Sequence, residues 1–355
     1  MKLNLHHPIR FCWPLLLALY SLLPAIASSR PLYEEGYWHI NGQQHYVCLR
    51  GQQADAPLLL WLHGGPGAAA TAMLRHFNRE LEQHFVVVYY EQRGAGRSYG
   101  RQPADTQLSV PIFIEDVHQL ILQLQQRFGN RPLHLVGHSW GSRLGMYVAR
   151  AYPELLASYT AIGQEVAAYE GELQSYQYTL LQAKQQGATQ AVATLQAMGP
   201  PKNGHYLQMY AHGFSDLVQQ KHWLLRLGGE RFGRHHYRDW VWLMLRKTSI
   251  GAVIQWSKAS ASTAGRMFAD PYFNDFDLRR DVAFVQVPVF FISGAADYNT
   301  PWPLVQQYYQ QLQAPAKDWL LVAEAGHSPQ FDRAAVVNEA IISWCKRWSS
   351  EAGRQ

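Results

Sequence analysis

The stretch HLVGHSWGSRLG, residues 134–145, contains a serine at the point where an apolar run gives way to a helical pattern. The run LHLVGH at 133–138 has the continuous apolar character of a strand that is buried on both faces of a sheet. Gly137 and Gly141 flank Ser139 in the pattern G-x-S-x-G, and small residues there allow a tight turn that lifts the serine hydroxyl out of the sheet. The stretch therefore predicts a strand-to-helix turn that presents Ser139 as a candidate nucleophile.

Similar apolar runs on both sides of this stretch predict the other strands of a sheet. The first predicted strands form a hairpin around Asn41-Gly42, a dipeptide typical of two-residue hairpin turns. A helix precedes the serine, because apolar side chains recur at helical spacing from Val117 to Phe128. This alternation predicts an α/β fold with a mostly parallel sheet. The predicted strands are PLLLWLH (57–63), FVVVYY (85–90), SYTAIG (158–163), VPVFFISG (287–294) and DWLLVAE (318–324).

A long segment between two of these strands shows a different pattern. Residues 165–283 read as helices rich in Gln, Tyr and Trp, with no clear strand. The economical architecture is a core formed by residues 28–164 and 284–355, into which residues 165–283 are inserted as a helical cap domain.

An acid and a histidine follow later strands in the order expected of partners for Ser139. Asp297 comes just after VPVFFISG, and His327 comes just after DWLLVAE. Because the carboxyl ends of parallel strands face one crevice, the three side chains are expected to meet there. His327 would then take the serine proton, and Asp297 would hold the imidazole in the correct tautomer. Asp318 is a weaker candidate for the acid, since it begins its strand.

An oxyanion hole is the remaining requirement of such a site. The loop His63–Gly67 follows an early strand, which is where a second backbone donor must come from. We expect the backbone N–H groups of Gly65 and Trp140 to form the hole. The indole ring of Trp140 is free for another task, and we expect it to wall the acyl pocket; the alternative is that the ring is packed in the core.

Composition excludes several classes of function. Of the 355 residues, 48% are hydrophobic and 16% are charged, and the chain holds 12 Trp, 20 Tyr and 14 Phe. This composition favours an aromatic-lined cavity over a nucleic-acid surface, and the net charge of +5 has no basic run behind it. The segment Gly94–Gly100 resembles a dinucleotide-binding loop, but its third glycine is displaced by one position. The histidine pairs at 6–7 and 235–236 lack partners at zinc spacing, so we expect no metal site.

The first residues have the layout of a secretory signal peptide. A basic start is followed by an apolar run from Phe11 to Ala27, and small residues precede Ser28, which predicts cleavage after Ala27. An uncleaved membrane anchor is the alternative. We therefore expect residues 1–27 to be removed and the protein to be periplasmic or secreted, without a stable membrane anchor. In that compartment Cys48 and Cys345 form either a disulfide or two buried thiols.

Five motifs together resemble those of serine peptidases of the prolyl iminopeptidase family. The resemblance implies an α/β-hydrolase fold, a helical cap, no cofactor, and release of N-terminal residues, often proline, from short peptides. It also implies Ser139, Asp297 and His327 as the catalytic triad, with Gly65 and Trp140 as the oxyanion hole. It covers about residues 57–164 and 284–347. The motifs are HGGPG (63–67), EQRGAGRS (91–98), GHSWGS (137–142), GAADYNTP (294–301) and AGHSPQF (325–331).

The chain departs from the family pattern at two points. Glu91 stands where the family usually has aspartate, at an expected structural position near the site. In the family, carboxylates of the cap hold the substrate's amino group, and no cap residue here matches a motif position. Glu165 is the first candidate because it directly follows a predicted strand, and Glu230 is the second; Glu170 and Glu172 are also available.

Two other functions compete with the aminopeptidase. An esterase or lactonase could use the same triad on small acyl substrates, and a non-catalytic binding protein could keep the fold. Dehalogenase and epoxide hydrolase chemistry is disfavoured, because those relatives carry aspartate at the position of Ser139. The expected partner is thus a small peptide or acyl substrate.

Overall fold

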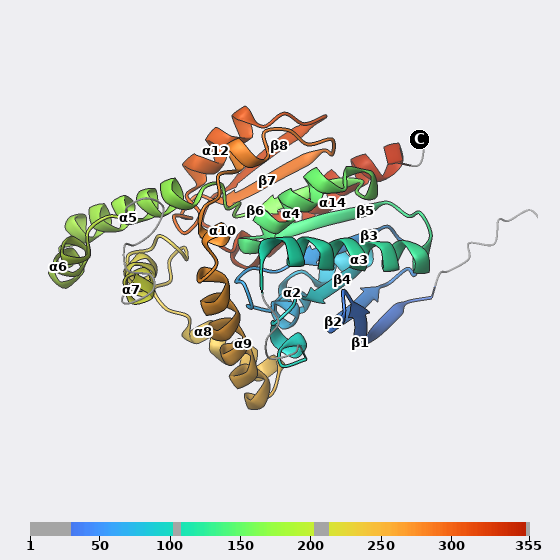
Figure 1. Ribbon diagram of the computed structural model, residues 1–355, viewed down its shortest axis with the longest axis horizontal. Coiled ribbons are helices and arrows are strands. Elements are labelled where there is room, and N and C mark those ends of the chain that lie inside the picture. Colours follow the sequence, from blue (N-terminus) through green and yellow to red (C-terminus); the bar gives the residue numbers. More distant parts are fainter. Residues whose placement is uncertain (1–29, 102–107, 202–212, 353–355) are drawn as a thin grey trace, which may run out of the picture.

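An eight-stranded sheet runs through the centre of the molecule (Figure 1). The structure is a computed structural model and describes residues 30–101, 108–201 and 213–352. The strands follow one another in the order β1-β2-β4-β3-β5-β6-β7-β8. Their bounds are β1 Leu32–Ile40, β2 Gln43–Gly51, β3 Leu58–Leu62, β4 Val86–Glu91, β5 Leu133–His138, β6 Ser158–Ile162, β7 Val289–Gly294 and β8 Lys317–Val322.

The sheet begins with the predicted hairpin and continues as a parallel sheet. Asn41 and Gly42 join β1 to β2 with φ of 45° and 75°, the left-handed backbone that this kind of two-residue turn requires. β1 pairs with β2 antiparallel and β2 pairs with β4 antiparallel, whereas the pairs from β4 to β8 are all parallel. The fold class predicted from the sequence, an α/β fold with a mostly parallel sheet, is confirmed.

Helices cover both faces of the sheet and bury alternate side chains of its strands. Leu58, Leu60 and Leu62 of β3 belong to one apolar cluster, and Leu59 and Trp61 belong to another on the opposite face. This alternation explains why the buried strands read as continuous apolar runs. The first cluster includes side chains of α3 (Val110–Phe128), α4 (Trp140–Ala151) and α12 (Trp302–Gln311), and the second includes side chains of α2 (Thr71–Phe77) and α14 (Ala334–Ala352).

The described residues between β6 and β7 are mainly helical. Side chains of α5, α6 and α7 form an apolar cluster of their own, and Figure 1 shows α5, α6 and α7 projecting away from the sheet at the left. α9 instead runs along loops of the core. The helices are α5 (Ala168–Gln185), α6 (Thr189–Met198), α7 (Gly213–Arg226), α8 (Arg238–Lys247), α9 (Ile250–Phe268), α10 (Pro271–Asn274) and α11 (Leu278–Asp281).

Short elements complete the fold. In the part of the chain that the structure describes, three 3-10 helices lie in loops of the core, and α13 follows β8 directly before α14. Their bounds are η1 Arg79–Gln83, η2 Gly96–Ser98, η3 Pro153–Leu155 and α13 Pro329–Asp332.

The two cysteines of the described chain are not joined. Cys48 and Cys345 are both buried free thiols, so of the two possibilities the disulfide is wrong. Cys48 lies in β2, whereas Cys345 of α14 contacts Ser158 of β6. Four strand spacings separate β2 from β6, roughly 19 Å, while a disulfide needs Cα atoms within about 7 Å.

The predicted signal peptide, residues 1–27, lies outside the described residues and stays a prediction. Among the described helices, none has the length and apolar character to cross a membrane.

Candidate functional site

Ser139 occupies a strained turn between β5 and α4. Its φ of 55° and ψ of −125° lie in a region that side chains rarely adopt. The flanking glycines make the turn possible: a side chain at Gly137 would run into the backbone of Gly141, and one at Gly141 would run into the carbonyl of Leu62. The backbone N–H of Ser139 donates to the carbonyl of Ile162 at 3.0 Å, which ties the turn to the end of β6. The turn that the sequence predicts is therefore present.

The loop after β3 lies directly beside the serine. A side chain at Gly64 would lie 3.1 Å from Cβ of Ser139, and Gly65 lines the same cavity as Ser139. Gln92 holds this loop: its backbone N–H donates to Nε2 of His63 at 3.0 Å, and its side-chain amide donates to the carbonyl of His63 at 2.8 Å. The structure thus places Gly65 beside the candidate nucleophile.

Trp140 has a different role from the one expected for its ring. The side chain is fully buried, and it does not line the cavity beside Ser139. Its indole N–H donates to Oε1 of Gln92 at 2.9 Å, and its ring packs edge-on against Phe113 at 5.5 Å. The prediction that the ring walls the acyl pocket is wrong, because a buried indole N–H needs a hydrogen-bond partner and finds it on the core side. Through Gln92, Trp140 connects the serine turn to the loop of His63.

Asp297 and His327 meet at the carboxyl ends of β7 and β8. Oδ2 of Asp297 lies 3.0 Å from Nδ1 of His327, and Asp297 is fully buried. Thr300 donates to the same carboxylate twice, from its backbone N–H at 2.9 Å and from its hydroxyl at 2.8 Å, and the backbone N–H of Asn299 adds a third bond at 3.0 Å. These donors hold the carboxylate as an acceptor, and a neutral His327 that donates from Nδ1 to Oδ2 leaves its Nε2 free to accept a proton.

The histidine is positioned next to the serine turn by backbone contacts. Nε2 of His138, the residue before Ser139, lies 2.8 Å from the carbonyl of His327. A side chain at Gly163 would lie 3.3 Å from both Oδ2 of Asp297 and Cε1 of His327. The backbone N–H of Ser139 is hydrogen-bonded to Ile162, the residue before Gly163. These contacts therefore bring the serine, the acid and the histidine together at the carboxyl ends of the strands.

Three carboxylates act on the pKa of His327. Burial lowers this pKa, but the charge and hydrogen bond of Asp297, with further contributions from Glu230 and Glu165, outweigh burial and raise it above its ordinary value. His138 behaves in the opposite way, because burial lowers its pKa to about 3. The pKa values of the two adjacent imidazoles are therefore shifted in opposite directions, and His327 is the better proton acceptor of the two.

A cavity of about 390 Å³ opens beside Ser139 under the inserted helices. Part of its lining is apolar and partly aromatic. Two ion pairs supply charged groups to the same lining. Nε of Arg143 lies 3.4 Å from Oε2 of Glu165, and Nζ of Lys221 lies 3.0 Å from Oε2 of Glu172. The apolar side chains include Val166, Leu217, Phe268, Phe273, Phe276 and Leu304.

Of the two expected cap carboxylates, the structure brings one into this cavity. Glu165 lines it together with Ser139, and burial raises its pKa although Arg143 acts against the shift. Glu230 does not line the cavity; its carboxylate accepts the hydroxyl of Tyr237, and its backbone carbonyl accepts the N–H of His327 at 2.8 Å. Glu230 therefore lies behind the histidine, where burial raises its pKa as well.

Sequence reasoning missed Arg143. This side chain is fully buried, its guanidinium carbon lies 3.9 Å from the ring centre of Phe276 and 4.2 Å from that of Phe273, and Nη1 donates to the carbonyl of Phe273 at 2.8 Å. Its position one helical turn after Ser139 was the available signal, because residues four apart lie on the same face of a helix.

The loop after β4 has a structural role. Glu91 is buried; it accepts the backbone N–H of Arg97 at 2.6 Å and pairs with the Arg97 guanidinium at 2.8 Å. The longer acid at this position thus organises the segment Gly94–Gly100, as expected. Within the part of the chain that the structure describes, no group of three or more metal-ligating side chains comes together; the histidines at 6–7 lie outside that part.

Comparisons with known proteins agree on the fold. The pattern of the α/β hydrolase fold family matches residues 57–334. The chain is 30% identical over 303 residues to a protein of Bacillus subtilis (strain 168) named probable aminopeptidase YbaC, a match that covers 84% of this chain and 91% of that protein. It is 22% identical over 324 residues to a proline iminopeptidase of Lactobacillus delbrueckii subsp. lactis, covering 87% and 97% of the two chains.

A solved structure gives the same result for the architecture. A proline iminopeptidase-related protein of Thermus thermophilus aligns with a TM-score of 0.65 at 22% identity, covering 90% of this chain and 99% of that one. At this level of identity the likeness establishes the shared fold.

Proposed function

Because the chain belongs to the α/β-hydrolase fold family, we propose that it is a serine aminopeptidase that releases N-terminal proline, or a residue of similar shape, from short peptides. Its nucleophile is Ser139, its base is His327, and its acid is Asp297. The family relationship supports a hydrolase, and the similarity to a probable aminopeptidase and to proline iminopeptidases supports the substrate class.

The proposed reaction passes through an acyl-enzyme. Oγ of Ser139 attacks the carbonyl carbon of the first peptide bond while Nε2 of His327 takes the hydroxyl proton. The backbone N–H groups of Gly65 and Trp140 stabilise the oxyanion. His327 then gives the proton to the departing amine, and the C–N bond breaks. A water molecule loses a proton to His327 and attacks the ester, which releases the amino acid and restores the serine.

The observation that carries the aminopeptidase is a half-buried carboxylate in the same cavity as the nucleophile. Glu165 lines that cavity with Ser139, and a free N-terminal ammonium needs such a partner because an unpaired charge is costly away from water. Phe268, Phe273 and Phe276 supply apolar rings against which the proline ring packs.

Arg143 gives the proposed carboxylate a fixed position. Its guanidinium is held between aromatic rings and pairs with one oxygen of Glu165. That pair orients the carboxylate and opposes the rise in its pKa that burial causes, and the substrate ammonium would be its second cation. Glu165 would therefore form two ion pairs at once, one with the fixed guanidinium of Arg143 and one with the ammonium of the bound substrate.

A substrate panel tests this proposal against the esterase or lactonase that would use the same triad. We expect the purified protein to cleave proline aryl-amides. Rapid turnover of nitrophenyl esters or lactones without measurable cleavage of any aminoacyl-amide would contradict the aminopeptidase and favour the esterase. Loss of both activities in Ser139→Ala, compared with no loss in a Ser257→Ala control on the exposed face of α9, assigns either reaction to this site.

A further inference from the structure

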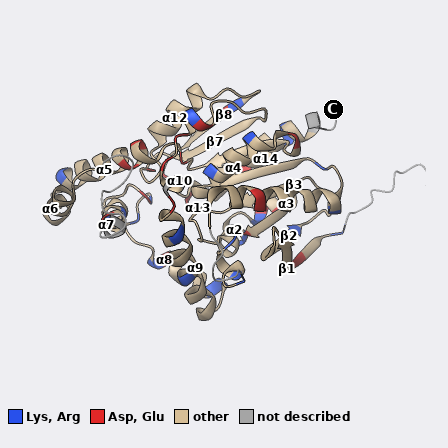
Figure 2. Ribbon diagram, in the orientation of Figure 1, with Lys and Arg blue, Asp and Glu red and all other residues tan. Residues whose placement is uncertain are grey.

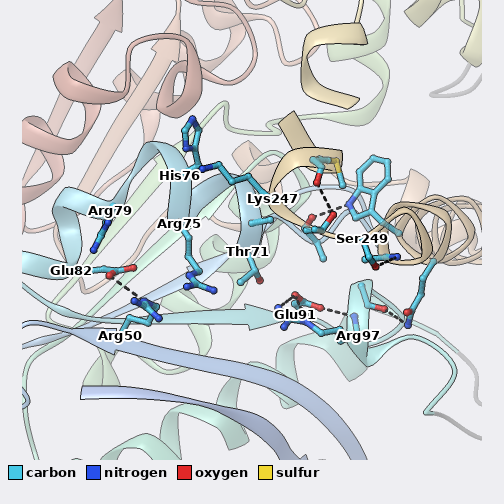
Figure 3. A pocket seen from close by; sticks show the side chains of 18 residues that line it. Arg50, Thr71, Arg75, His76, Arg79, Glu82, Glu91, Arg97, Lys247 and Ser249 are labelled. Atoms are coloured by element: carbon cyan, nitrogen blue, oxygen red, sulfur yellow. Dashed lines mark hydrogen bonds and ion pairs between the residues drawn. The ribbon is translucent and has the colours of Figure 1, made fainter. Parts of the chain in front are cut away.

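A second and larger cavity lies between the core and the inserted helices, away from the catalytic cavity. Its volume is about 670 Å³, within the range of small-molecule sites. Its walls come from β2, β4, α2 and η1 of the core and from α8 and α9 of the insertion (Figure 3). None of its lining residues belongs to the proposed triad, oxyanion hole or amine site.

The charge of this cavity is strongly positive. Five arginine or lysine side chains line it, against two carboxylates. The excess of three positive charges is more than half of the net charge of +5 carried by the whole chain. The basic side chains are Arg50, Arg75, Arg79, Arg97 and Lys247, the carboxylates are Glu82 and Glu91, and His76, Thr71 and Ser249 add polar groups.

Both carboxylates are already neutralised by two of the arginines. Glu82 pairs with Arg50 at 3.3 Å and also accepts the hydroxyl of Tyr89 at 3.0 Å. Glu91 pairs with Arg97 at 2.8 Å. These two pairs form the floor of the cavity, so the buried carboxylates do not face an incoming anion as free charges.

The other three cations face the cavity without an acidic partner. Within residues 30–101, 108–201 and 213–352, no carboxylate lies within ion-pair distance of Arg75, Arg79 or Lys247. Figure 3 shows Arg75 directed toward the space between the Arg50 and Arg97 pairs, with Lys247 on the wall formed by the insertion. Figure 2 shows further basic segments on α8 and α9 at the lower end of the molecule.

The positive field also reaches a neighbouring strand. Glu35 of β1 has a lowered pKa; the hydrogen bond from Tyr46 is the main cause, and the charges of Arg97, Arg75 and Arg50 contribute in the same direction. A carboxylate that does not line the cavity is thus already stabilised by three of its arginines.

We propose that this cavity, which we call the basic cavity, binds a small anion that carries at least two phosphate or carboxylate groups. Three unpaired cations from different elements match several negative groups better than one, and arginine favours the planar oxygens of phosphate and carboxylate. A hollow of this volume fits a small molecule, whereas a nucleic acid would need a continuous basic surface.

Such a ligand would connect the insertion to the core. Lys247 ends α8 of the insertion, while Arg75 belongs to α2 of the core. α9 lines both cavities and is hydrogen-bonded to loops of the core. The indole N–H of Trp256 donates to the carbonyl of Ala69 at 2.9 Å, and the hydroxyl of Thr263 donates to the carbonyl of Gly94 at 2.7 Å. Binding therefore stabilises the folded arrangement of the two parts, through residues that take no part in the proposed reaction at Ser139.

Calorimetric titration of the whole protein with inorganic pyrophosphate and with citrate, at about 50 mM ionic strength, tests the basic cavity. We expect at least one of the two to bind, and the tighter one identifies phosphate or carboxylate as the preferred group. Arg79→Gln combined with Lys247→Gln should weaken binding at least tenfold, and acetate should bind at least tenfold more weakly than citrate. Both substituted side chains are exposed, so the variant is expected to fold, which its melting temperature checks.

The matched control is Arg226→Gln, which removes an exposed cation of α7 outside the cavity and should change binding by less than twofold. The proposal is overturned if neither pyrophosphate nor citrate binds with a dissociation constant below about 10 mM. It is also overturned if the double variant binds as tightly as the wild type, or if acetate binds as tightly as citrate.

Discussion

The core and the insertion contribute to the same cavity in different ways. In the core, Ser139, Asp297 and His327 are placed by strand ends and backbone turns, and their positions follow from the register of a parallel sheet. In the insertion and at its hinge, Glu165 and Glu172 are placed by ion pairs with Arg143 and Lys221. In the proposed reaction, the core therefore determines which bond is attacked, and the insertion determines which substrate reaches it.

The largest expected effect tests the contribution of the core. Ser139→Ala removes the proposed nucleophile, and we expect kcat to fall by about 10⁴ to 10⁶, because the remaining oxyanion hole and binding contacts supply only a small part of the rate. A fluorophosphonate probe should label the wild type at Ser139 and leave the variant unlabelled. Equal labelling of the two proteins would show that another residue is the nucleophile.

A second, smaller effect tests how the insertion acts on the core. In the proposed reaction neutral His327 is the base, and its pKa is raised above the ordinary value of 6.5 by nearby carboxylates. The rate of fluorophosphonate labelling should therefore fall as the pH drops through this raised pKa. Glu165→Gln removes one of the negative charges that favour the imidazolium, so the fall should move to lower pH.

The control for this measurement is Glu339→Gln, an exposed position on α14 whose variant should follow the wild-type profile. An unchanged profile in Glu165→Gln, or a shift to higher pH, would contradict the effect of the Glu165 charge on the pKa of His327. Because labelling needs no amine on the probe, the profile separates the state of His327 from recognition of the substrate.

The smallest expected effect concerns the reactivity of two buried cysteines of the core, Cys48 and Cys345. Both thiols are buried, and burial raises the pKa of Cys345 to about 12 and that of Cys48 above its ordinary value. Alkylation of the folded protein should be slow at both residues, since the thiolate is the reactive form. In denaturant without a reductant, both should react fully. A peptide in which Cys48 and Cys345 are cross-linked would contradict the free thiols.

The sequence predicted the core well because its signals are local. Continuous apolar runs located every strand from β3 to β8 within two residues, and the pattern around Ser139 identified the strained turn. Asp297 and His327 could be chosen because the ends of parallel strands lie together. Asp318 is exposed at the start of β8, as its position in the run indicated.

The features that the sequence did not reveal depend on contacts between distant segments. The direction of the Trp140 ring is decided by Gln92, which hydrogen-bonds the indole from the loop after β4. The ion pair of Arg143 with Glu165 joins α4 to the residues after β6, and the basic cavity gathers cations from β2, α2 and α8. No short motif marks such arrangements, because each partner alone resembles an ordinary surface or core residue.

Discrimination between free and blocked amines tests the account most directly. We predict that N-acetylation of a proline aryl-amide lowers kcat/KM of the wild type at least about tenfold, equivalent to roughly 1.4 kcal/mol. Glu165→Gln should narrow this gap, while Glu339→Gln should leave it unchanged. A gap that survives Glu165→Gln but narrows in Glu230→Gln would move amine recognition to Glu230. A wild type that cleaves both substrates equally well, or a gap that survives both variants, would contradict the claim that these carboxylates select the substrate.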